Sequence, residues 1–281
     1  MSAADTFRAA AAACRDDPRR DGNVVHLAGE LSVLVAGDLH GNLRHLGRIV
    51  SHADLPARPQ RRLVLQEVIH GHVDARTGRE DSINALLRAA RLKATRPGQV
   101  VFVLGNHDVA QVTGNEIVKF GGRLCEAFEA GVRHAFGDET GDVLAAVGAF
   151  LRSLPLAVRC DNGVWVTHSL PRVRPGERID TEVLRRPYRP ADFARGGAVY
   201  EWTWGRGQPP ESIDALASEL GAELFVLGHL HVEPGAEALC DRAVTLTSEH
   251  ARGRVLEFST AQPLDTATAV AATIPVAALG V

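Results

Sequence analysis

Five short runs of aliphatic residues recur along this chain, and each ends abruptly at a side chain that can bind a metal ion. Runs of this kind, bounded by glycine and polar residues, are typical of β-strands buried on both faces. In open α/β sheets, ligands gather outside the carboxyl ends of such strands. The side chains that end the runs are therefore expected to converge on one crevice. They are Asp38 and His40, Glu67, Asn106, His107 and Asp108, His168, and His229 and His231.

The residue types at these strand ends favour a site for two metal ions. A lone histidine after a strand is usually an ordinary polar residue, and an aspartate before a glycine-rich stretch is usually part of a turn. Five such endings in a chain with 12 histidines are poorly explained by coincidence. Carboxylate, imidazole and amide ligands together suit Mn, Fe, Zn, Co or Ni better than Ca or Mg. The sequence thus predicts two divalent or trivalent metal ions bound by Asp38, His40, Glu67, Asn106, His168, His229 and His231.

Length and composition are typical of a single enzyme domain spanning residues 1–281. A chain of 281 residues with 45% hydrophobic content can bury a large core, and α/β folds of this size often form one domain. The net charge of -3 gives no reason to expect nucleic acid or a membrane as a partner. Four scattered cysteines without a C-x-x-C pair suit a reducing compartment, and the N-terminus does not resemble a secretory signal. We therefore expect a cytoplasmic protein.

The hydrophobic pattern predicts strands that alternate with helices around the core. The Ala-rich start of the chain is expected to form a helical appendage (residues 1–30). Residues 171–210, rich in Arg, Pro and Gly, are either a solvated surface excursion or a lid over the crevice. The tail at 261–281 is expected to pack on the body or fray, because it is too short to span a bilayer comfortably. Strands are expected near residues 31–36, 62–67, 99–104 and 223–227, a hairpin around the DNG turn at 161–163, and a second sheet from 243–249 and 253–259.

Three of the strand ends carry the strings GDLHGN, GNHD and GHLH, in this order, within residues 37–231. This combination resembles the calcineurin-like metallophosphoesterase superfamily, and in particular its bacterial phosphoprotein-phosphatase-like branch. The resemblance implies an α/β fold, specifically a four-layer αββα sandwich of two mixed β-sheets flanked by helices. It also implies a dinuclear metal centre in which one ion is held by Asp38, His40 and His231, and the other by Asn106, His168 and His229.

The same resemblance implies a proton donor for the leaving group. His107 is similar to the general acid of the family, and Asp108 to the acidic residue that orients it. Departure of an alkoxide from phosphorus requires a proton, which an imidazolium can supply if a neighbouring carboxylate keeps it charged. We therefore expect His107 and Asp108 to be the catalytic pair.

The second strand departs from the family pattern, because it ends in Gln66-Glu67 where the family usually has Gly-Asp. Glu67 supplies a carboxylate at the matching place, so it is expected to bridge the two ions with one extra methylene group. A competing alignment of GHVDARTG would place His72 at the bridge. We disfavour it because His72 lies several residues into a loop and a neutral imidazole is a poor bridge between two cations.

A shorter string, YEWTWGRG, is similar to the LWxR stretch of bacterial protein phosphatases and dinucleoside polyphosphate hydrolases. This similarity implies that Arg206 contacts the substrate phosphate, and a guanidinium can bind phosphate through two parallel hydrogen bonds. Asn106 is expected to contact the substrate as well. The alternative is that Trp202 and Trp204 simply pack against the body of the protein and that Arg206 has no role in binding.

These features together predict a metal-dependent phosphoesterase that hydrolyses phosphomonoesters or phosphoanhydrides by a metal-bridging hydroxide. Two adjacent cations bind phosphate oxygens and lower the pKa of a bridging water, which explains why such sites cleave phosphate esters. The expected partner is a small-molecule phosphoester or a phosphoprotein. Two alternatives remain: a phosphodiesterase or nuclease, for which the Arg-rich segment is the main argument, and a non-catalytic metal-containing binding protein.

Overall fold

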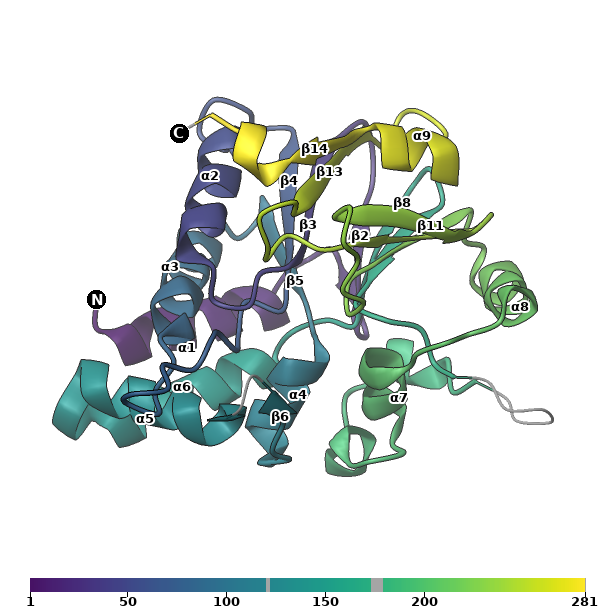
Figure 1. Ribbon diagram of the computed structural model, residues 1–281. Coiled ribbons are helices and arrows are strands. Elements are labelled where there is room, and N and C mark those ends of the chain that lie inside the picture. Colours follow the sequence, from purple (N-terminus) through teal and green to yellow (C-terminus); the bar gives the residue numbers. More distant parts are fainter. Residues whose placement is uncertain (120–121, 173–178, 281) are drawn as a thin grey trace.

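Two β-sheets lie face to face between layers of helices in the computed structural model (Figure 1), which describes residues 1–119, 122–172 and 179–280. Both sheets contain parallel and antiparallel pairs. This arrangement confirms the expected α/β sandwich. None of the helices in the described residues is long and apolar enough to cross a membrane.

The five-stranded sheet carries the first three strand ends of the predicted site. Strands β3, β4 and β5 are parallel neighbours in this sheet, so their carboxyl ends lie together at one end of it. The two remaining strands pair antiparallel on the other side of β3. In sheet order the strands are β14 (Thr273–Pro275), β13 (Arg254–Ser259), β3 (Ser32–Asp38), β4 (Arg61–Gln66) and β5 (Val100–Val103).

The seven-stranded sheet carries the last two strand ends. Strands β9, β10 and β12 run parallel to one another, and β8 and β9 form the antiparallel hairpin expected around the DNG turn. In sheet order the strands are β1 (Arg20–Asp21), β2 (Val24–Leu27), β8 (Ala157–Cys160), β9 (Val164–Thr167), β10 (Leu224–Leu227), β12 (Ala243–Leu246) and β11 (Ala236–Cys240). A short third sheet pairs β6 (Val118–Lys119) with β7 (Gly122–Arg123).

Valine side chains fill the space between the two large sheets. Val33 and Val64 from one sheet share a single buried cluster with Val166 and Val226 from the other. Burial of both sheet faces explains why these strands are continuous aliphatic runs instead of alternating patterns. The tight packing fixes the two sheets against each other, and it thereby fixes the distance between strand ends that belong to different sheets.

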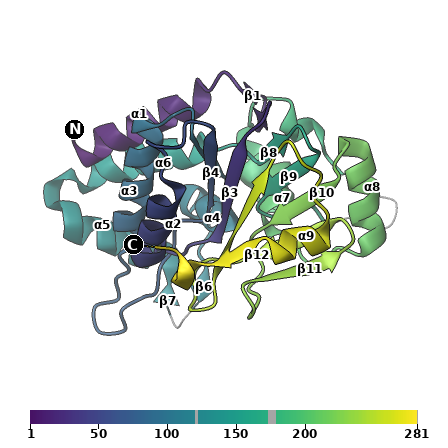
Figure 2. The same cartoon turned by 90° about the horizontal axis from the view of Figure 1, so that it is seen from above.

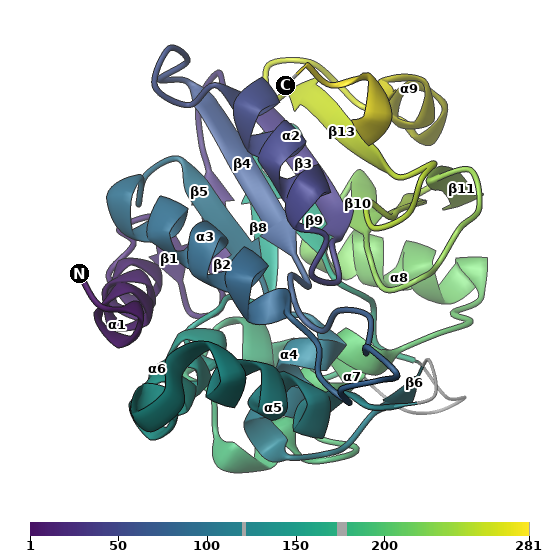
Figure 3. The ribbon, with the colours of Figure 1, turned by 60° about the vertical axis from the view of Figure 1, so that its left-hand side comes forward.

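Helices cover the outer faces of both sheets (Figures 2 and 3). Helices α1, α2 and α3 lie on the side of β3, β4 and β5, whereas α8 lies beside β10. Helix α4 begins at Asn106, directly after β5. The helices are α1 (Ala3–Arg15), α2 (Leu43–Ala53), α3 (Ser82–Thr95), α4 (Asn106–Thr113), α5 (Leu124–Phe136), α6 (Thr140–Arg152), α7 (Ala198–Trp204), α8 (Pro210–Leu220) and α9 (Thr266–Ala271).

Several segments can be compared with what the sequence pattern indicated. Helix α1 is part of the core and not an appendage, because the buried Phe7 ring lies 5.9 Å from that of Phe150. The segments at 243–249 and 253–259 do not form a sheet together: β12 joins the seven-stranded sheet and β13 the five-stranded one. The tail packs on the body, where Val276 is buried. Part of the expected lid, residues 173–178, lies outside the described residues.

Candidate metal centre

The strand ends converge where the carboxyl ends of the two sheets meet. Three residues there leave their strands with left-handed backbone angles: His40 (φ 41°), Glu67 (φ 38°) and His229 (φ 66°). Non-glycine residues rarely adopt such angles, and they cost roughly 1–3 kcal/mol each. Strain of this kind concentrates at functional sites because it turns a side chain toward a place that regular backbone would not reach.

Two glycines allow the strand ends to approach closely. A Cβ atom at Gly228 would overlap the Asp38 carboxylate, which comes from the other sheet. A Cβ atom at Gly105 would lie 2.8 Å from Glu67 Oε1, which is closer than real contacts of this type. The glycines of the GHLH and GNHD strings are therefore required by the crowding of carboxylates beside them.

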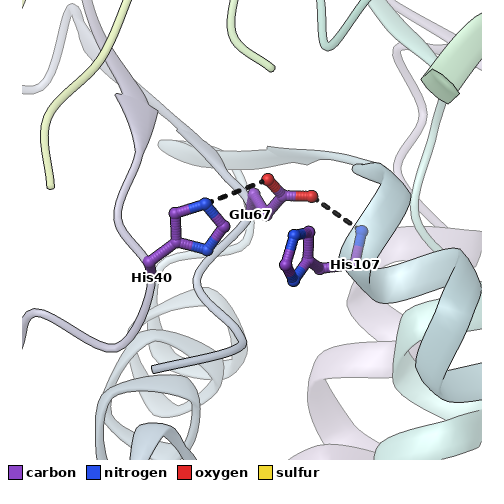
Figure 4. Close-up of side chains that lie close together, drawn as sticks. All are labelled: His40, Glu67 and His107. Atoms are coloured by element: carbon purple, nitrogen blue, oxygen red, sulfur yellow. Dashed lines mark hydrogen bonds and ion pairs between the residues drawn. The ribbon is translucent and has the colours of Figure 1, made fainter. Parts of the chain in front are cut away.

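Glu67 belongs to two groups of potential metal ligands. In the first group (Figure 4), His40 Nε2 lies 3.5 Å from Glu67 Oε2, and His107 is the third member. In the second group, His168 lies 3.4 Å from Glu67 Oε1 through Nε2 and 3.5 Å from Asp38 Oδ1 through Nδ1. The carboxylate of Glu67 thus has one oxygen toward each group, as a bridging ligand requires. Asp38 lies beside His168, whereas the resemblance implied that it shares an ion with His40.

The amide of Asn106 completes the second group. Its Oδ1 lies 2.9 Å from His168 Nε2 and 2.8 Å from His229 Nδ1. The backbone N–H of His229 donates to Asp38 Oδ2 at 2.9 Å, which ties the end of β10 to the end of β3. The structure therefore brings together six of the seven expected ligands: Asp38, His40, Glu67, Asn106, His168 and His229.

The unpartnered atoms at this cluster fit metal ions. Asp38 Oδ1 and His168 Nδ1 face each other, and both are buried without a hydrogen bond among the described residues. Burial raises the pKa of the Asp38 carboxyl to about 7, and burial followed by the charge of Asp38 raises the pKa of Glu67. Two carboxylates so close together need a compensating positive charge, which bound cations would supply.

The imidazoles of the cluster have the protonation state that metal binding requires. Burial lowers the pKa of His40 to about 4 and that of His229 to about 3, and it lowers the pKa of His168 well below its usual value. These rings are therefore neutral near pH 7 and offer a lone pair. Neutral imidazole is the form that binds metal ions.

His231, the seventh expected ligand, lies apart from both groups. Its side chain is 58% exposed, and its Nδ1 lies 3.1 Å from Glu249 Oε1. The ring of His250 lies 4.8 Å away on the surface. His72, the alternative bridging residue, is exposed and belongs to neither group.

The surroundings of His107 differ from the expected pairing with Asp108. Asp108 Oδ2 accepts a hydrogen bond from the backbone N–H of Gly105 at 2.8 Å and so caps the first turn of α4. His107 Nδ1 instead lies 3.2 Å from Nδ1 of the buried His70, whose Nε2 lies 2.8 Å from Gln111 Oε1. His70 was not among the residues expected at the site, and its one signal in the sequence was the position three residues after Glu67.

Arg206 lies at the second group. Its Nε donates to His229 Nε2 at 2.7 Å. The two tryptophans of the same string behave differently: Trp202 is buried in the body, whereas Trp204 stacks on Tyr200 with ring centroids 5.5 Å apart. Trp204 and Arg206 both line a pocket of about 390 Å³, together with Arg172, Arg195, Gly196, Tyr200, Glu201 and Gly205.

Comparison with solved structures shows the same fold in phosphatases. A protein serine/threonine phosphatase from Saccharomyces cerevisiae, described as similar to human phosphatase PP5, has a TM-score of 0.67 and 16% identity, over 91% of this chain and 81% of that chain. A cold-active protein-tyrosine phosphatase of a psychrophilic Shewanella species has a TM-score of 0.55 and 13% identity, over 85% and 78% of the two chains. At such identities the likeness concerns the fold alone.

Sequence comparison gives a family. No curated protein sequence matches the chain. A family model described as calcineurin-like phosphoesterase matches residues 31–233, which include every strand end described above. The chain therefore belongs to the calcineurin-like phosphoesterase family and is a hydrolase of phosphate esters.

Proposed function

We propose that this enzyme hydrolyses phosphomonoesters or phosphoanhydrides with two metal ions bound at the strand-end cluster. The observation that carries the proposal is the presence of Glu67 in both ligand groups. A carboxylate has two oxygens and a negative charge, so it can hold two cations side by side. When bound, the two ions neutralise phosphate oxygens and provide a hydroxide nucleophile near neutral pH.

The ligands divide into two ion sites that share Glu67. We assign His40 and Glu67 to the first ion site, and Asn106, His168 and His229 with Glu67 to the second. Asp38 contributes its Oδ1 oxygen as a further metal ligand. This oxygen has no other partner among the described residues. The mixed nitrogen and oxygen ligands support Mn, Fe, Zn, Co or Ni as the bound metals.

His107 is the proposed general acid. It belongs to the first ligand group with His40 and Glu67 (Figure 4), so its ring would lie beside a phosphate bound to the first ion. Its Nδ1 faces His70, which leaves Nε2 toward the leaving group. Burial lowers the pKa of His107, so Nε2 can hand over a proton only when the ring is an imidazolium, a form that the phosphate dianion would stabilise. Such a proton transfer contributes typically about 10²–10⁴-fold to the rate.

The arginine-lined pocket supports an anionic substrate. Arg172, Arg195 and Arg206 line it with a single carboxylate, Glu201. Guanidinium groups bind phosphate oxygens tightly, and a phosphomonoester dianion or a phosphoanhydride carries more charge than a diester does. Arg206 connects the pocket to the second ion site through His229. We therefore place the scissile phosphoryl group beside Arg206 and the remainder of the substrate along the pocket.

A substrate panel tests this function directly. Protein purified without chelator and assayed for metal content is expected to hydrolyse alkyl phosphates, p-nitrophenyl phosphate or phosphoanhydrides, and to lose activity in chelator. Faster turnover of bis-p-nitrophenyl phosphate than of the monoester would favour the phosphodiesterase alternative. Two bound metal ions without turnover of any phosphoester would favour the non-catalytic alternative.

A further inference from the structure

A buried carboxylate, that of Glu80, joins the two ends of the loop that connects β4 to α3. Its Oε2 accepts hydrogen bonds from the backbone N–H of Gly71 at 2.9 Å and from that of Ser82 at 2.6 Å, and its Oε1 accepts from the Ser82 hydroxyl at 2.7 Å. Glu80 is 1% exposed, and it forms no ion pair with any of the described residues. Burial raises the pKa of its carboxyl, and the three hydrogen bonds oppose that rise. The hydrogen bonds therefore replace water around this carboxylate.

The hydrogen bond to Gly71 fixes the backbone of His70. The N–H of Gly71 belongs to the peptide group that joins His70 to Gly71, so Glu80 holds one side of His70 directly. The ring of His70 is held separately, because its Nε2 lies 2.8 Å from Gln111 Oε1. With backbone and ring both held, the Nδ1 of His70 lies 3.2 Å from the Nδ1 of His107. Glu80 is thus one of two supports for the contact between the two imidazoles.

Three glycines allow the chain to pack closely around Glu80. A Cβ atom at Gly71 would lie 2.9 Å from Glu80 Oε2, and one at Gly41, in the loop after β3, would lie 2.8 Å from the Cβ of Ser82. A Cβ atom at Gly131, in α5, would overlap the backbone oxygen of Glu80. The loops after β3 and β4 therefore meet α5 around this one residue. Removal of the carboxylate would leave two backbone N–H groups without their acceptor in a place that water hardly reaches.

We propose that Glu80 is a positioning residue, which holds His70 against His107 and thereby orients the proposed general acid. The inference rests on the function proposed above, with His107 as the proton donor. Glu80 belongs to neither group of potential metal ligands, so it acts through the backbone of the loop and by the geometry of its hydrogen bonds. A proton donor matters most where the leaving group departs badly. Loss of Glu80 should therefore slow alkyl phosphates selectively, which a general loss of stability would not do.

Four variants separate the positioning role from a purely structural one. Glu80→Ala removes all three hydrogen bonds. Glu80→Asp is shorter by one methylene group and cannot reach Gly71 and Ser82 together, so it serves if Glu80→Ala does not fold. Glu80→Gln is the conservative variant, because its amide oxygen can accept from both N–H groups and its NH₂ can donate to the Ser82 hydroxyl. Asp74→Ala is the matched control, because Asp74 is an exposed carboxylate that accepts from the Arg76 N–H at 2.8 Å in the same loop.

Steady-state kinetics on two substrates is the first measurement. In Glu80→Ala and Glu80→Asp, kcat on alkyl phosphates should fall by about 10-fold, with little change on p-nitrophenyl phosphate and normal metal content. Glu80→Gln and Asp74→Ala should match the wild type, and Glu80→Ala should add little to His70→Ala. An equal loss on both substrates, or full additivity with His70→Ala, would overturn the proposal. So would a loss in Glu80→Gln as large as that in Glu80→Ala, because the hydrogen bonds are kept.

Nuclear magnetic resonance tests the positioning role without reference to turnover. In Zn²⁺-loaded protein with ¹⁵N-labelled imidazoles, a coupling between the Nδ1 atoms of His70 and His107 reports the hydrogen bond between them. The coupling should be present in the wild type and Glu80→Gln, and lost in Glu80→Ala and Glu80→Asp. A coupling that persists in Glu80→Ala, or that is missing from the wild type, overturns the role of Glu80. The expected pattern in a protein that hydrolyses no phosphoester would overturn the proposed function and leave the positioning of His70 standing.

Discussion

Glu67 Oε1 accepts a hydrogen bond from the backbone N–H of His107 at 2.7 Å. The carboxylate that is common to both ligand groups therefore also holds the first turn of α4, which carries Asn106 and His107. The proposed metal site and the position of the proposed general acid are thus mechanically connected. A change at Glu67 should affect both, whereas a change at His107 should affect only one.

Replacement of Glu67 should remove metal and activity together. Glu67→Gln keeps the shape of the side chain but loses the charge that two cations need, so we expect loss of at least one ion and of most turnover. Glu67→Asp should keep a measurable fraction of activity, because the carboxylate remains. Metal analysis and phosphatase assays check both, with the exposed Glu237→Gln as control. Unchanged metal content and turnover in Glu67→Ala would show that another residue bridges the ions.

Replacement of His107 should separate acid catalysis from metal binding. His107→Asn is expected to slow hydrolysis of alkyl phosphates by about 10²–10⁴-fold, because their alkoxide needs a proton to depart. Hydrolysis of p-nitrophenyl phosphate should slow much less, and metal content should stay normal. A rate that falls equally on both substrates would indicate a role in phosphate binding, and lost metal would make His107 a ligand.

His70 should act through His107. Its Nε2 lies 2.8 Å from Gln111 Oε1, an acceptor, so the proton of a neutral His70 lies on Nε2 and its Nδ1 can accept from His107 Nδ1. His70→Ala should therefore lower kcat on alkyl phosphates by about 10- to 100-fold with little change in KM. In a double-mutant cycle, His70→Ala should add little to His107→Asn, because both remove the same function. Full additivity would argue that His70 has a separate role.

Arg206 should contribute to binding of the phosphoryl group. Arg206→Ala removes a charged hydrogen-bond donor worth about 1.5–3 kcal/mol, so kcat/KM should fall by about 10- to 100-fold. Arg206→Lys should restore only part of this, because an ammonium cannot make two parallel hydrogen bonds. Competition by inorganic phosphate measures the binding directly. Arg185→Ala is the control, because the Arg185 side chain is 70% exposed and lies in another part of the Arg-rich segment 171–210. Unchanged phosphate inhibition in Arg206→Ala would leave Arg206 without a role in binding.

A buried ion pair distant from the site should control acid stability. Asp17 accepts hydrogen bonds from Arg19 at 2.8 and 2.7 Å and lies 3.5 Å from the buried Lys93. Burial alone would raise the pKa of Asp17, but the contacts with Arg19 outweigh it and the pKa is lowered. The stabilisation is therefore present above the ordinary carboxyl pKa and is lost as the pH falls through the lowered value. Asp17→Asn should lower the free energy of unfolding by about 3–5 kcal/mol at pH 7.

Thermal unfolding across pH checks the Asp17 prediction. The difference in Tm between the wild type and Asp17→Asn should be largest at neutral pH and shrink below about pH 4. Asp16→Asn is the matched control, because Asp16 is the exposed neighbour on the same turn. A difference that stays constant down to pH 2 would contradict the role of the ionised carboxylate.

The strand ends could be predicted because their signal is local. Aliphatic runs such as those before Asp38 and Asn106 are buried on both faces, and parallel strands place their carboxyl ends at one edge regardless of loop detail. The helix at the start of the chain was predicted, but its packing into the core was not, because nothing in its own sequence indicates that Phe7 packs against Phe150 in a distant helix.

The residues that sequence analysis missed lie in loops whose paths depend on tertiary hydrogen bonds. His70 reaches His107 only because the loop after β4 returns toward α4. The loop after β12 is likewise fixed by tertiary contacts, since Asn42 and His45, from the cap and first turn of α2, contact the backbone oxygens of Glu249 and Ser248.

The left-handed backbone at His40, Glu67 and His229 has an evolutionary consequence. Glycine adopts such angles without strain, so a population selected only for thermal resistance should drift toward glycine at these three positions. A large side chain at each of the three positions therefore costs folding stability relative to glycine. Deep mutational scanning with separate readouts for abundance and for phosphate release should show the two preferences diverging most at His40, Glu67 and His229.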